Sequence, residues 1–146
     1  MSRTQLDARS LRFAAWVTSA VLAAVLATGS WELAAAQTLV FAAGAFAGLR
    51  RAPYGLVFRY AVRPFLGPPV ETEDEAPPRF AQLVGFVFGV AGTVGYGVGP
   101  AALGVAAIAL ALAAALLNAA FGLCLGCLCY LRLRLWVPPV ARMFGQ

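Results

Sequence analysis

Histidine and lysine are both missing from this chain of 146 residues, so arginine supplies all 11 basic side chains. Histidine is the usual general base, proton relay and metal ligand, and its absence excludes a Ser-His-Asp or Cys-His hydrolase. Cysteine is scarce: three residues are too few for a secreted disulfide framework and one short of the four ligands that zinc prefers. We therefore expect neither a metal nor another cofactor.

Charge is scarce too. Charged residues make up 12% of the chain and hydrophobic residues 62%, whereas a soluble domain carries about twice that share of charge. The composition predicts an all-α integral membrane protein with the lipid bilayer as its surroundings. The net charge of +5 does not indicate nucleic-acid binding, because the arginines flank apolar runs, where they orient spans and meet anionic lipid.

Four apolar runs predict four transmembrane helices, arranged as two helical hairpins in a single membrane domain. Each run is just long enough for a hydrocarbon core about 30 Å thick, which needs roughly 20 helical residues. The predicted spans cover residues 13–28, 31–49, 80–98 and 101–121. A signal peptide is the alternative for the first run, but a second span follows it after a turn of only a few residues.

The distribution of arginine predicts the orientation of these spans. Arginines lie in the N-terminal segment, in the loop 50–79 and in the C-terminal segment 122–146, whereas the turns near residues 30 and 99 have none. By the positive-inside rule, the loop 50–79, both termini and the cysteines face the cytoplasm of a bacterial plasma membrane.

A short interfacial helix is predicted after the second span. Arg59 and Arg63 are four residues apart and share one helix face, while Phe58, Val62 and Phe65 can face lipid.

The two halves of the chain resemble each other, as in an internal duplication. Arg12-Phe13-Ala14 opens the first half and Arg79-Phe80-Ala81 opens the second. Each is followed by a predicted hairpin and then by an arginine-containing segment that ends in proline. Because both halves start on the same side, the repeat is parallel, and it predicts a second interfacial segment after the fourth span.

The third predicted span carries a stripe of glycines, Gly85, Gly89, Gly92 and Gly95, spaced four, three and three residues apart. This spacing places small residues on one helix face, where another backbone can approach closely.

All three cysteines lie in one short segment after the fourth predicted span. Cys124 and Cys127 form a C-x-x-C; on a helix they share a face about 5 to 6 Å apart, within the Cα separation that a disulfide allows. We predict these two as the catalytic residues of a membrane thiol/disulfide or sulfane-sulfur relay, in which Cys127 attacks and Cys124 resolves. Cys129 and Tyr130 are auxiliary candidates.

The reactivity of these thiols depends on where the fourth helix ends. If it continues past Cys127, the thiols lie near its negative end, which disfavours the thiolate. If a glycine of this segment breaks it, Cys127 can start a new helix, and its thiolate is stabilised. The repeat favours a break, and we hypothesise that Arg51 or Arg59 lies close to Cys124 or Cys127.

Other interpretations of the cysteines stay open. Cysteine is a small, commonly buried residue that often only packs. The chain would then be a non-catalytic membrane scaffold, an accessory subunit of a larger complex whose glycine stripe packs against partners, or a small sulfur-compound carrier. Reversible palmitoylation is a further alternative. Free thiol reactivity near neutral pH would favour the relay.

Several short motifs together resemble one known family. They are Asp7-Ala8-Arg9 with Arg12-Phe13, Pro53-Tyr54-Gly55 with Arg59, Arg63-Pro64, Leu66-Gly67-Pro68-Pro69, Glu73-Asp74, Pro77-Pro78-Arg79-Phe80-Ala81-Gln82, and Asn118-Ala119-Ala120-Phe121-Gly122 leading into Cys124-Leu125-Gly126-Cys127 and Tyr130. Over nearly its whole length the chain resembles the bacterial membrane family called domain of unknown function 4395. It departs from the family pattern at Ala8, at Ser10-Leu11 and at the extra Cys129, which puts a family role for Cys129 in doubt.

The resemblance implies a four-helix membrane protein with a C-x-x-C on its cytoplasmic side. The family has no settled activity. Its loose association with thioredoxin-like and rhodanese-like sulfur proteins suggests a partner of one of these kinds, by analogy only. A homo-oligomer or a larger membrane complex is compatible with the same resemblance.

Overall fold

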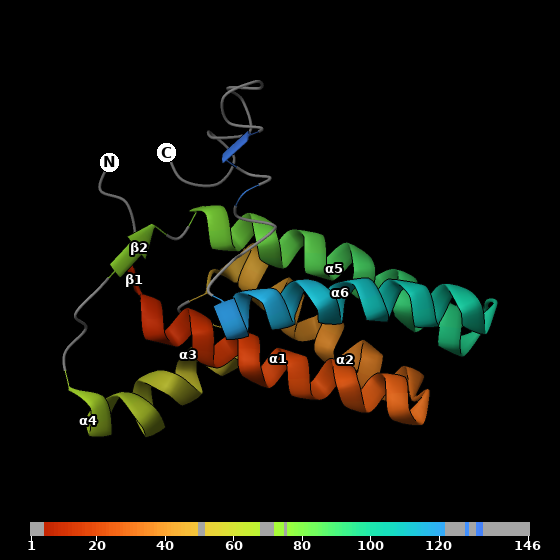
Figure 1. The fold of residues 1–146 in the computed structure, drawn as a ribbon, viewed down its shortest axis with the longest axis horizontal. Helices are drawn as coiled ribbons and strands as arrows, with labels where there is room; N and C mark the ends of the chain where they lie inside the picture. The colour runs from red at the N-terminus through yellow and green to blue at the C-terminus, as the bar shows by residue number, and fades with distance from the viewer. Residues whose placement is uncertain are drawn as a thin grey trace.

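The computed structural model describes residues 5–49, 52–67, 72–74, 76–121, 128 and 131–132. Four long helical segments lie side by side, and a row of short helical segments and a small two-stranded ribbon lie at one end of them (Figure 1). In chain order the elements are β1 (Gln5–Asp7), α1 (Ala8–Thr28), α2 (Trp31–Ala42), the π-helix η1 (Ala43–Ala47), α3 (Pro53–Val57), the π-helix η2 (Phe58–Val62), α4 (Arg63–Leu66), β2 (Thr72–Asp74), α5 (Ala76–Gly97) and α6 (Ala101–Phe121).

The turn between α1 and α2 follows from two small residues. Gly29 takes a positive φ of 65°, which costs glycine nothing. Its amide donates to the carbonyl of Val25 at 2.7 Å, so the last turn of α1 closes on it. Ser30 then caps α2, its hydroxyl accepting from the amide of Leu33 at 3.2 Å, and Glu32 places a negative charge in the positive first turn.

Glycine and proline also set the ends of the short helical segments. Gly48, with a φ of 103°, ends η1, and Gly67, with a φ of 81°, ends α4. Pro53 begins α3 at a position where its missing amide hydrogen leaves no bond unmade. The continuous helical segment formed by α2 and η1 therefore stops at Ala47, and the chain restarts in a new direction a few residues later.

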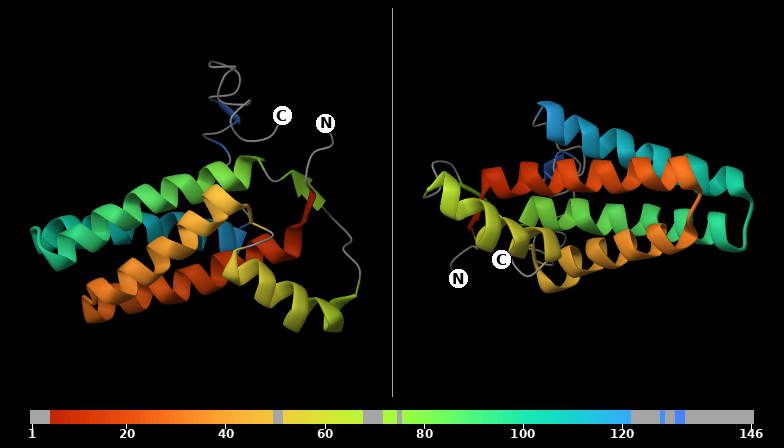
Figure 2. Two further views of the ribbon diagram at one scale, coloured as in Figure 1. Left: turned by 180° about the vertical axis from the view of Figure 1, so that it is seen from behind. Right: turned by 90° about the horizontal axis from the view of Figure 1, so that it is seen from below.

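The four long segments form a ring. α1 packs along α6, α6 along α5, and α5 along α2 with η1, whereas α1 and α2 meet much less extensively although they are consecutive. Figure 2 shows this ring from below and from behind. The first helix of each half therefore packs mainly on the second helix of the other half. In the second half, α5 and α6 form the closely packed hairpin that the sequence predicts.

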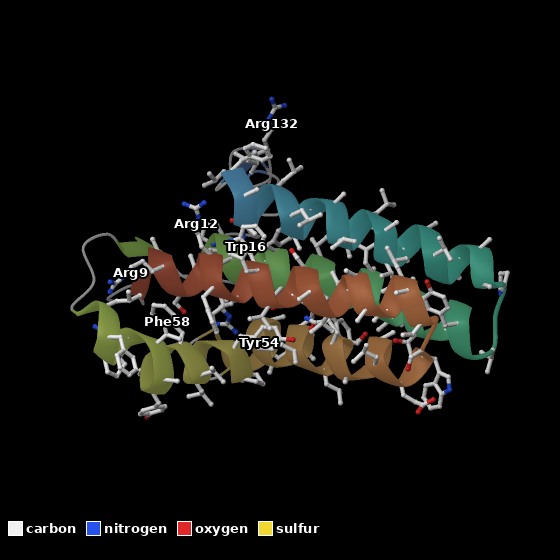
Figure 3. The ribbon with its side chains drawn as sticks, turned by 60° about the horizontal axis from the view of Figure 1, so that its bottom comes forward. Arg9, Arg12, Trp16, Tyr54, Phe58 and Arg132 are labelled. Carbon is white, nitrogen blue, oxygen red and sulfur yellow. The ribbon has the colours of Figure 1, made fainter. Side chains whose placement is uncertain are left out.

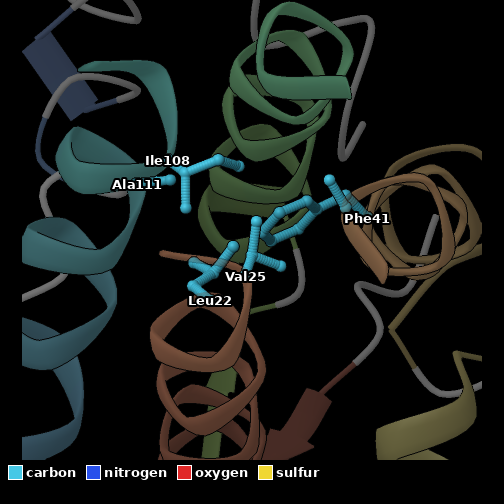
Figure 4. Close-up of a cluster of buried hydrophobic side chains, with 6 residues drawn as sticks. Leu22, Val25, Phe41, Ile108 and Ala111 are labelled. Carbon is cyan, nitrogen blue, oxygen red and sulfur yellow. The ribbon is translucent and has the colours of Figure 1, made fainter. Parts of the chain in front are cut away.

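The buried core lies where the four segments converge. Leu22 and Val25 of α1 meet Phe41 of α2 and Ile108 and Ala111 of α6 (Figure 4). These side chains are apolar and face inward, while many large apolar side chains of the same helices are exposed. A helix that is apolar on its outward face as well as on its inward face is typical of a segment surrounded by lipid.

The glycine stripe of α5 packs against other helices of the same chain. A Cβ atom at Gly89 would overlap Thr38 of α2, and one at Gly95 would overlap the backbone of Gly104 in α6. The other two stripe glycines behave alike: a Cβ at Gly85 would lie 2.7 Å from Phe41, and one at Gly92 would lie 2.5 Å from Ile108. The stripe lets α5 approach α2 with one part of its length and α6 with the other.

The sequence did not predict the two short strands. β1 and β2 pair antiparallel, with Leu6 opposite Glu73, and so bring the start of the chain onto the acidic linker before α5. Close by, Arg9 donates to the carbonyls of Leu66 at 3.2 Å and Gly67 at 2.9 Å. The far end of α4 is thereby tied to the first turn of α1.

Among the residues that the structure describes, three helices are long and apolar enough to cross a membrane: α1, the Pro77–Gly97 part of α5, and α6. The remaining apolar segment, Trp31–Ala47, is shorter and combines α2 with η1. The prediction of a helical membrane protein is thus supported. The second of the four predicted spans, residues 31–49, falls on this shorter segment, so a fourth spanning helix is not confirmed.

The segment from α3 to α4 leaves the bundle at the end where α1 begins (Figure 2). Every exposed side chain in it is uncharged, and nearly all are apolar: Pro53, Leu56, Val57, Tyr60, Ala61, Pro64, Phe65 and Leu66. Phe58 does not face outward as the sequence suggested. It is 2% exposed, and its ring lies 5.8 Å from that of Phe13, filling the space between η2 and α1. Phe65, at 88% exposed, does face outward.

Candidate functional site

The predicted catalytic residues Cys124 and Cys127 lie outside the described residues. The same holds for three of the auxiliary candidates, Cys129, Tyr130 and Arg51. The hypothesis that Arg51 or Arg59 lies close to the thiols therefore stays a prediction. What the structure describes is the end of α6, up to Phe121, from which the cysteine segment continues.

Arg59 belongs to η2 and is half-buried. Its guanidinium carbon lies 5.4 Å from the centre of the neighbouring Tyr60 ring, within the range of a cation–π contact.

Arg12 contacts the end of α6. Its Nη2 donates to the carbonyl of Ala119 at 3.0 Å (Figure 3 shows Arg12 beside this end of the bundle). Ala119 is fully buried and belongs to the last turn of α6, whose carbonyls have no partner within the helix. A guanidinium here satisfies one of these carbonyls and places a positive charge at the negative end of the helix.

Arg79 makes the corresponding contact in the other half of the chain. Its Nε and Nη2 donate to the carbonyl of Ala45 at 3.2 and 2.9 Å, and Nη2 also reaches the carbonyl of Phe46 at 3.4 Å. Both acceptors lie in η1, at the end of the second helical segment. Each Arg-Phe-Ala motif thus starts one half of the chain and holds the last turn of the second helix of the other half.

Arg12 was not predicted as a site residue, although the two Arg-Phe-Ala motifs are visible in the sequence. That repeat was the signal that could have found it, because equivalent residues of a duplicated chain make equivalent contacts. The helix to which each arginine would bind could not be read from the sequence, since α1 packs on α6 rather than mainly on its neighbour α2.

A second group of polar residues lies inside the bundle. The buried polar side chains in the described part of the chain are Thr18, Ser19, Gln37 and Thr38. Thr38 faces α5, where its hydroxyl lies 3.3 Å from that of Thr93. Gln37, one residue earlier, faces α3 instead, and its Oε1 accepts a hydrogen bond of 2.5 Å from the hydroxyl of Tyr54.

The side chains of Tyr54 and Gln37 are hydrogen-bonded to each other, but the amide nitrogen of Gln37 is left unpaired. Burial raises the pKa of Tyr54, so its hydroxyl stays protonated at neutral pH and donates. Gln37 is 2% exposed, and its Nε2 has no hydrogen-bond partner in the described part of the chain. An amide nitrogen buried without an acceptor costs about 1 to 3 kcal/mol of folding free energy, so Gln37 lowers the stability of the fold.

No group of three or more acidic, histidine or cysteine side chains that could hold a metal ion occurs among the residues that the structure describes.

Comparison with known families gives one result. The family model described as domain of unknown function (DUF4395) matches residues 6–134. The chain belongs to this family. The match runs from β1 past the end of α6 and takes in the cysteine segment, both Arg-Phe-Ala motifs and the Gln37–Tyr54 pair. No curated protein and no solved structure matches the chain.

Proposed function

We propose that this member of the family is a membrane thiol relay, in which the C-x-x-C of Cys124 and Cys127 exchanges electrons or sulfane sulfur with a soluble thioredoxin-like or rhodanese-like partner at the cytoplasmic face. The observation that carries the proposal is the contact between Arg12 and the carbonyl of Ala119. It fixes a positive charge in the last described turn of α6, five residues before Cys124.

The positive charge of Arg12 opposes the effect of the helix end, which by itself disfavours a thiolate. The negative end of α6 would by itself make the following thiols poor nucleophiles. A guanidinium bound to that end offsets the partial negative charge of the carbonyls and favours a thiolate nearby. Arg12, rather than Arg51 or Arg59, is the activating arginine in this proposal.

The proposed reaction balances within the pair of proteins. The thiolate of Cys127 attacks a disulfide of the partner, and a mixed disulfide forms while one partner thiol leaves. Cys124 then attacks Cys127, a disulfide forms between them, and the partner leaves as a dithiol. Two electrons pass to the partner. With a persulfide partner, Cys127 takes the terminal sulfur, and the partner leaves as a thiolate.

The attacking and resolving roles are tested by trapping. With an oxidised thioredoxin-like protein, the Cys124→Ser variant should accumulate a mixed disulfide through Cys127, because the resolving thiol is gone. The Cys127→Ser variant is the matched control and should accumulate none. Non-reducing electrophoresis followed by peptide mass spectrometry identifies the linked cysteine. Trapping by neither variant would contradict the relay, and trapping by Cys127→Ser alone would reverse the roles.

We further propose that all four apolar segments span the membrane, with the α3–α4 segment at the cytoplasmic interface. The shorter segment Trp31–Ala47 would extend about 25 Å at 1.5 Å per residue, which a locally thinned bilayer accommodates. Two observations support this arrangement. Arg79 and Arg12 bind the ends of η1 and α6 at the same end of the ring, and the exposed side chains of α3–α4 are uncharged and nearly all apolar.

Cysteine labelling tests the orientation. Val98, in the turn between α5 and α6, and Phe65, in α4, are 89% and 88% exposed, so they are matched positions at opposite ends. In a chain whose own cysteines are replaced by serine, a membrane-impermeant maleimide should label Val98→Cys on intact cells. It should label Phe65→Cys only after the cells are permeabilised. The reverse pattern would place the cysteine segment outside.

The glycine stripe does not support the alternative of a membrane scaffold or accessory subunit. The glycine stripe, which would have been the surface for a partner subunit, is occupied by α2 and α6 of the same chain.

A further inference from the structure

The segment from α3 to α4 combines large exposed apolar side chains with arginine. Its large exposed side chains are Leu56, Val57, Tyr60, Phe65 and Leu66. An apolar surface of this kind marks a place where a membrane or a partner binds. The same segment carries Arg59 and Arg63, both half-buried. Apolar contacts and positive charge are therefore offered together on one short stretch of helix.

The positive charge of Arg59 lies at the surface of this segment. Its guanidinium carbon is 5.4 Å from the centre of the Tyr60 ring, and Tyr60 is 72% exposed. Arg63 follows four residues later, about one helical turn along, so the two arginines share one face. Guanidinium groups donate paired hydrogen bonds to phosphate oxygens. Two of them on one face can bind the same phosphate group.

Arg9 offsets the negative end of α4. The last carbonyls of a helix have no partner within it, and they would repel an anion. Arg9 donates to the carbonyls of Leu66 at 3.2 Å and Gly67 at 2.9 Å, and Figure 3 shows it beside this end of α4. A third guanidinium thus covers the carbonyl end of the segment that carries Arg59 and Arg63.

Acidic residues are scarce around these arginines. The sequence from residue 33 to residue 70 contains none. Glu32 lies in the first turn of α2, next to the turn that ends α1, whereas the α3–α4 segment lies where α1 begins (Figure 2). The β1–β2 ribbon, which includes Glu73 and Asp74, lies apart from α4 on the far side of the start of α1 (Figure 1). The α3–α4 surface is therefore complementary to an anion.

We propose that the α3–α4 segment is a binding surface for anionic phospholipid, with Arg59 and Arg63 on the phosphate and the exposed apolar side chains against the acyl chains. The inference rests on the proposed placement of this segment at the cytoplasmic interface. Lipid is favoured over a soluble protein because α3 and η2 pack on α1, a helix long and apolar enough to cross a membrane. A zwitterionic headgroup carries its own cation beside the phosphate, so the arginines favour an anionic one.

Native mass spectrometry of the full-length protein in detergent tests this proposal. The probes are dioleoylphosphatidylglycerol and dioleoylphosphatidylcholine, which share their acyl chains and differ in net charge. The wild type should bind phosphatidylglycerol at least tenfold more tightly than phosphatidylcholine. Arg59→Gln and Arg63→Gln should each weaken phosphatidylglycerol binding about fivefold, and the double variant should weaken it at least tenfold. The single variants suffice if the double variant does not fold.

Arg79→Gln is the matched control. It removes the same charge at the same end of the ring, but the guanidinium of Arg79 binds the carbonyl of Ala45 in η1 instead of lying on the α3–α4 segment. This variant should bind phosphatidylglycerol within twofold of the wild type. Glycerol phosphate, which has the phosphate without acyl chains, should not displace the lipid at millimolar concentration.

Three results would overturn the proposal: equal affinity of the wild type for the two lipids, equal losses for Arg79→Gln and the Arg59→Gln/Arg63→Gln variant, or displacement of the lipid by glycerol phosphate. None of these results affects the trapping or labelling experiments, so failure of the lipid surface is distinguishable from failure of the relay or of the orientation. Reversed maleimide labelling with the lipid preference intact would remove the orientation and retain the lipid surface.

Discussion

Replacing Gly95 by alanine should push α5 and α6 apart and lower the free energy of unfolding by about 3 kcal/mol. The added methyl group would lie 2.7 Å from the Cα of Gly104 and would overlap its amide nitrogen. Both are backbone atoms, which cannot turn aside as a side chain can. The loss should appear as a large decrease in the thermal unfolding midpoint in detergent.

Gly97→Ala is the matched control, two residues further along the same helix. There the new methyl group would lie 3.7 Å from Trp31, an ordinary van der Waals contact. Alanine also restricts the unfolded chain more than glycine does, so this variant should be neutral or slightly stabilised. Equal midpoints for the two variants would contradict the close packing of α5 on α6.

Replacing Tyr54 by phenylalanine should lower the free energy of unfolding by about 1 to 3 kcal/mol. It removes the bond to Oε1 of Gln37 and leaves a buried amide with neither of its ends paired. Gln37→Leu should cost much less, because it removes the unpaired Nε2 together with the acceptor of the half-buried Tyr54 hydroxyl.

The double variant Gln37→Leu/Tyr54→Phe measures the coupling between the two side chains. If they interact as the structure has them, the double variant should be more stable than Tyr54→Phe alone, since no buried amide is left. Additive effects of the two substitutions would show that the side chains do not interact. Unfolding of the four proteins under one set of detergent conditions supplies the cycle.

Much of the fold could be predicted from the sequence because it depends on local patterns. The range 101–121 coincides with α6, and α2 begins at Trp31 as predicted, because Gly29-Ser30 and Gly99-Pro100 are strong turn signals. α1 and α5 begin several residues before the predicted spans. The predicted spans were bounded by arginine, which does not end a helix. The apolar runs show where a helix is surrounded by lipid, but not where its first polar turn begins.

The contacts between helices could not be predicted in the same way. The glycine stripe indicated a close approach but not that α2 and α6 share it. Phe58 was expected to face lipid because its position on an isolated helix allows that, and only the packing of η2 on α1 turns it inward. The pairing of Arg12 with α6 and of Arg79 with η1 likewise depends on the order of helices in the ring.

The alkylation rate of each cysteine as a function of pH, read by mass spectrometry on reduced protein, tests the central claim most directly. A unit charge about 10 Å from a thiolate is worth roughly 0.8 kcal/mol at an effective dielectric constant of about 40, which is about fourfold in thiolate population. Arg12→Gln removes a positive charge that favours the thiolate, so it should shift the profile of Cys127 to higher pH and slow its alkylation at pH 7 by about that factor. Arg79→Gln removes the equivalent arginine at the end of η1 and should leave the profile unchanged. Equal profiles for the two variants, or cysteines that stay unlabelled in the folded protein, would contradict the account.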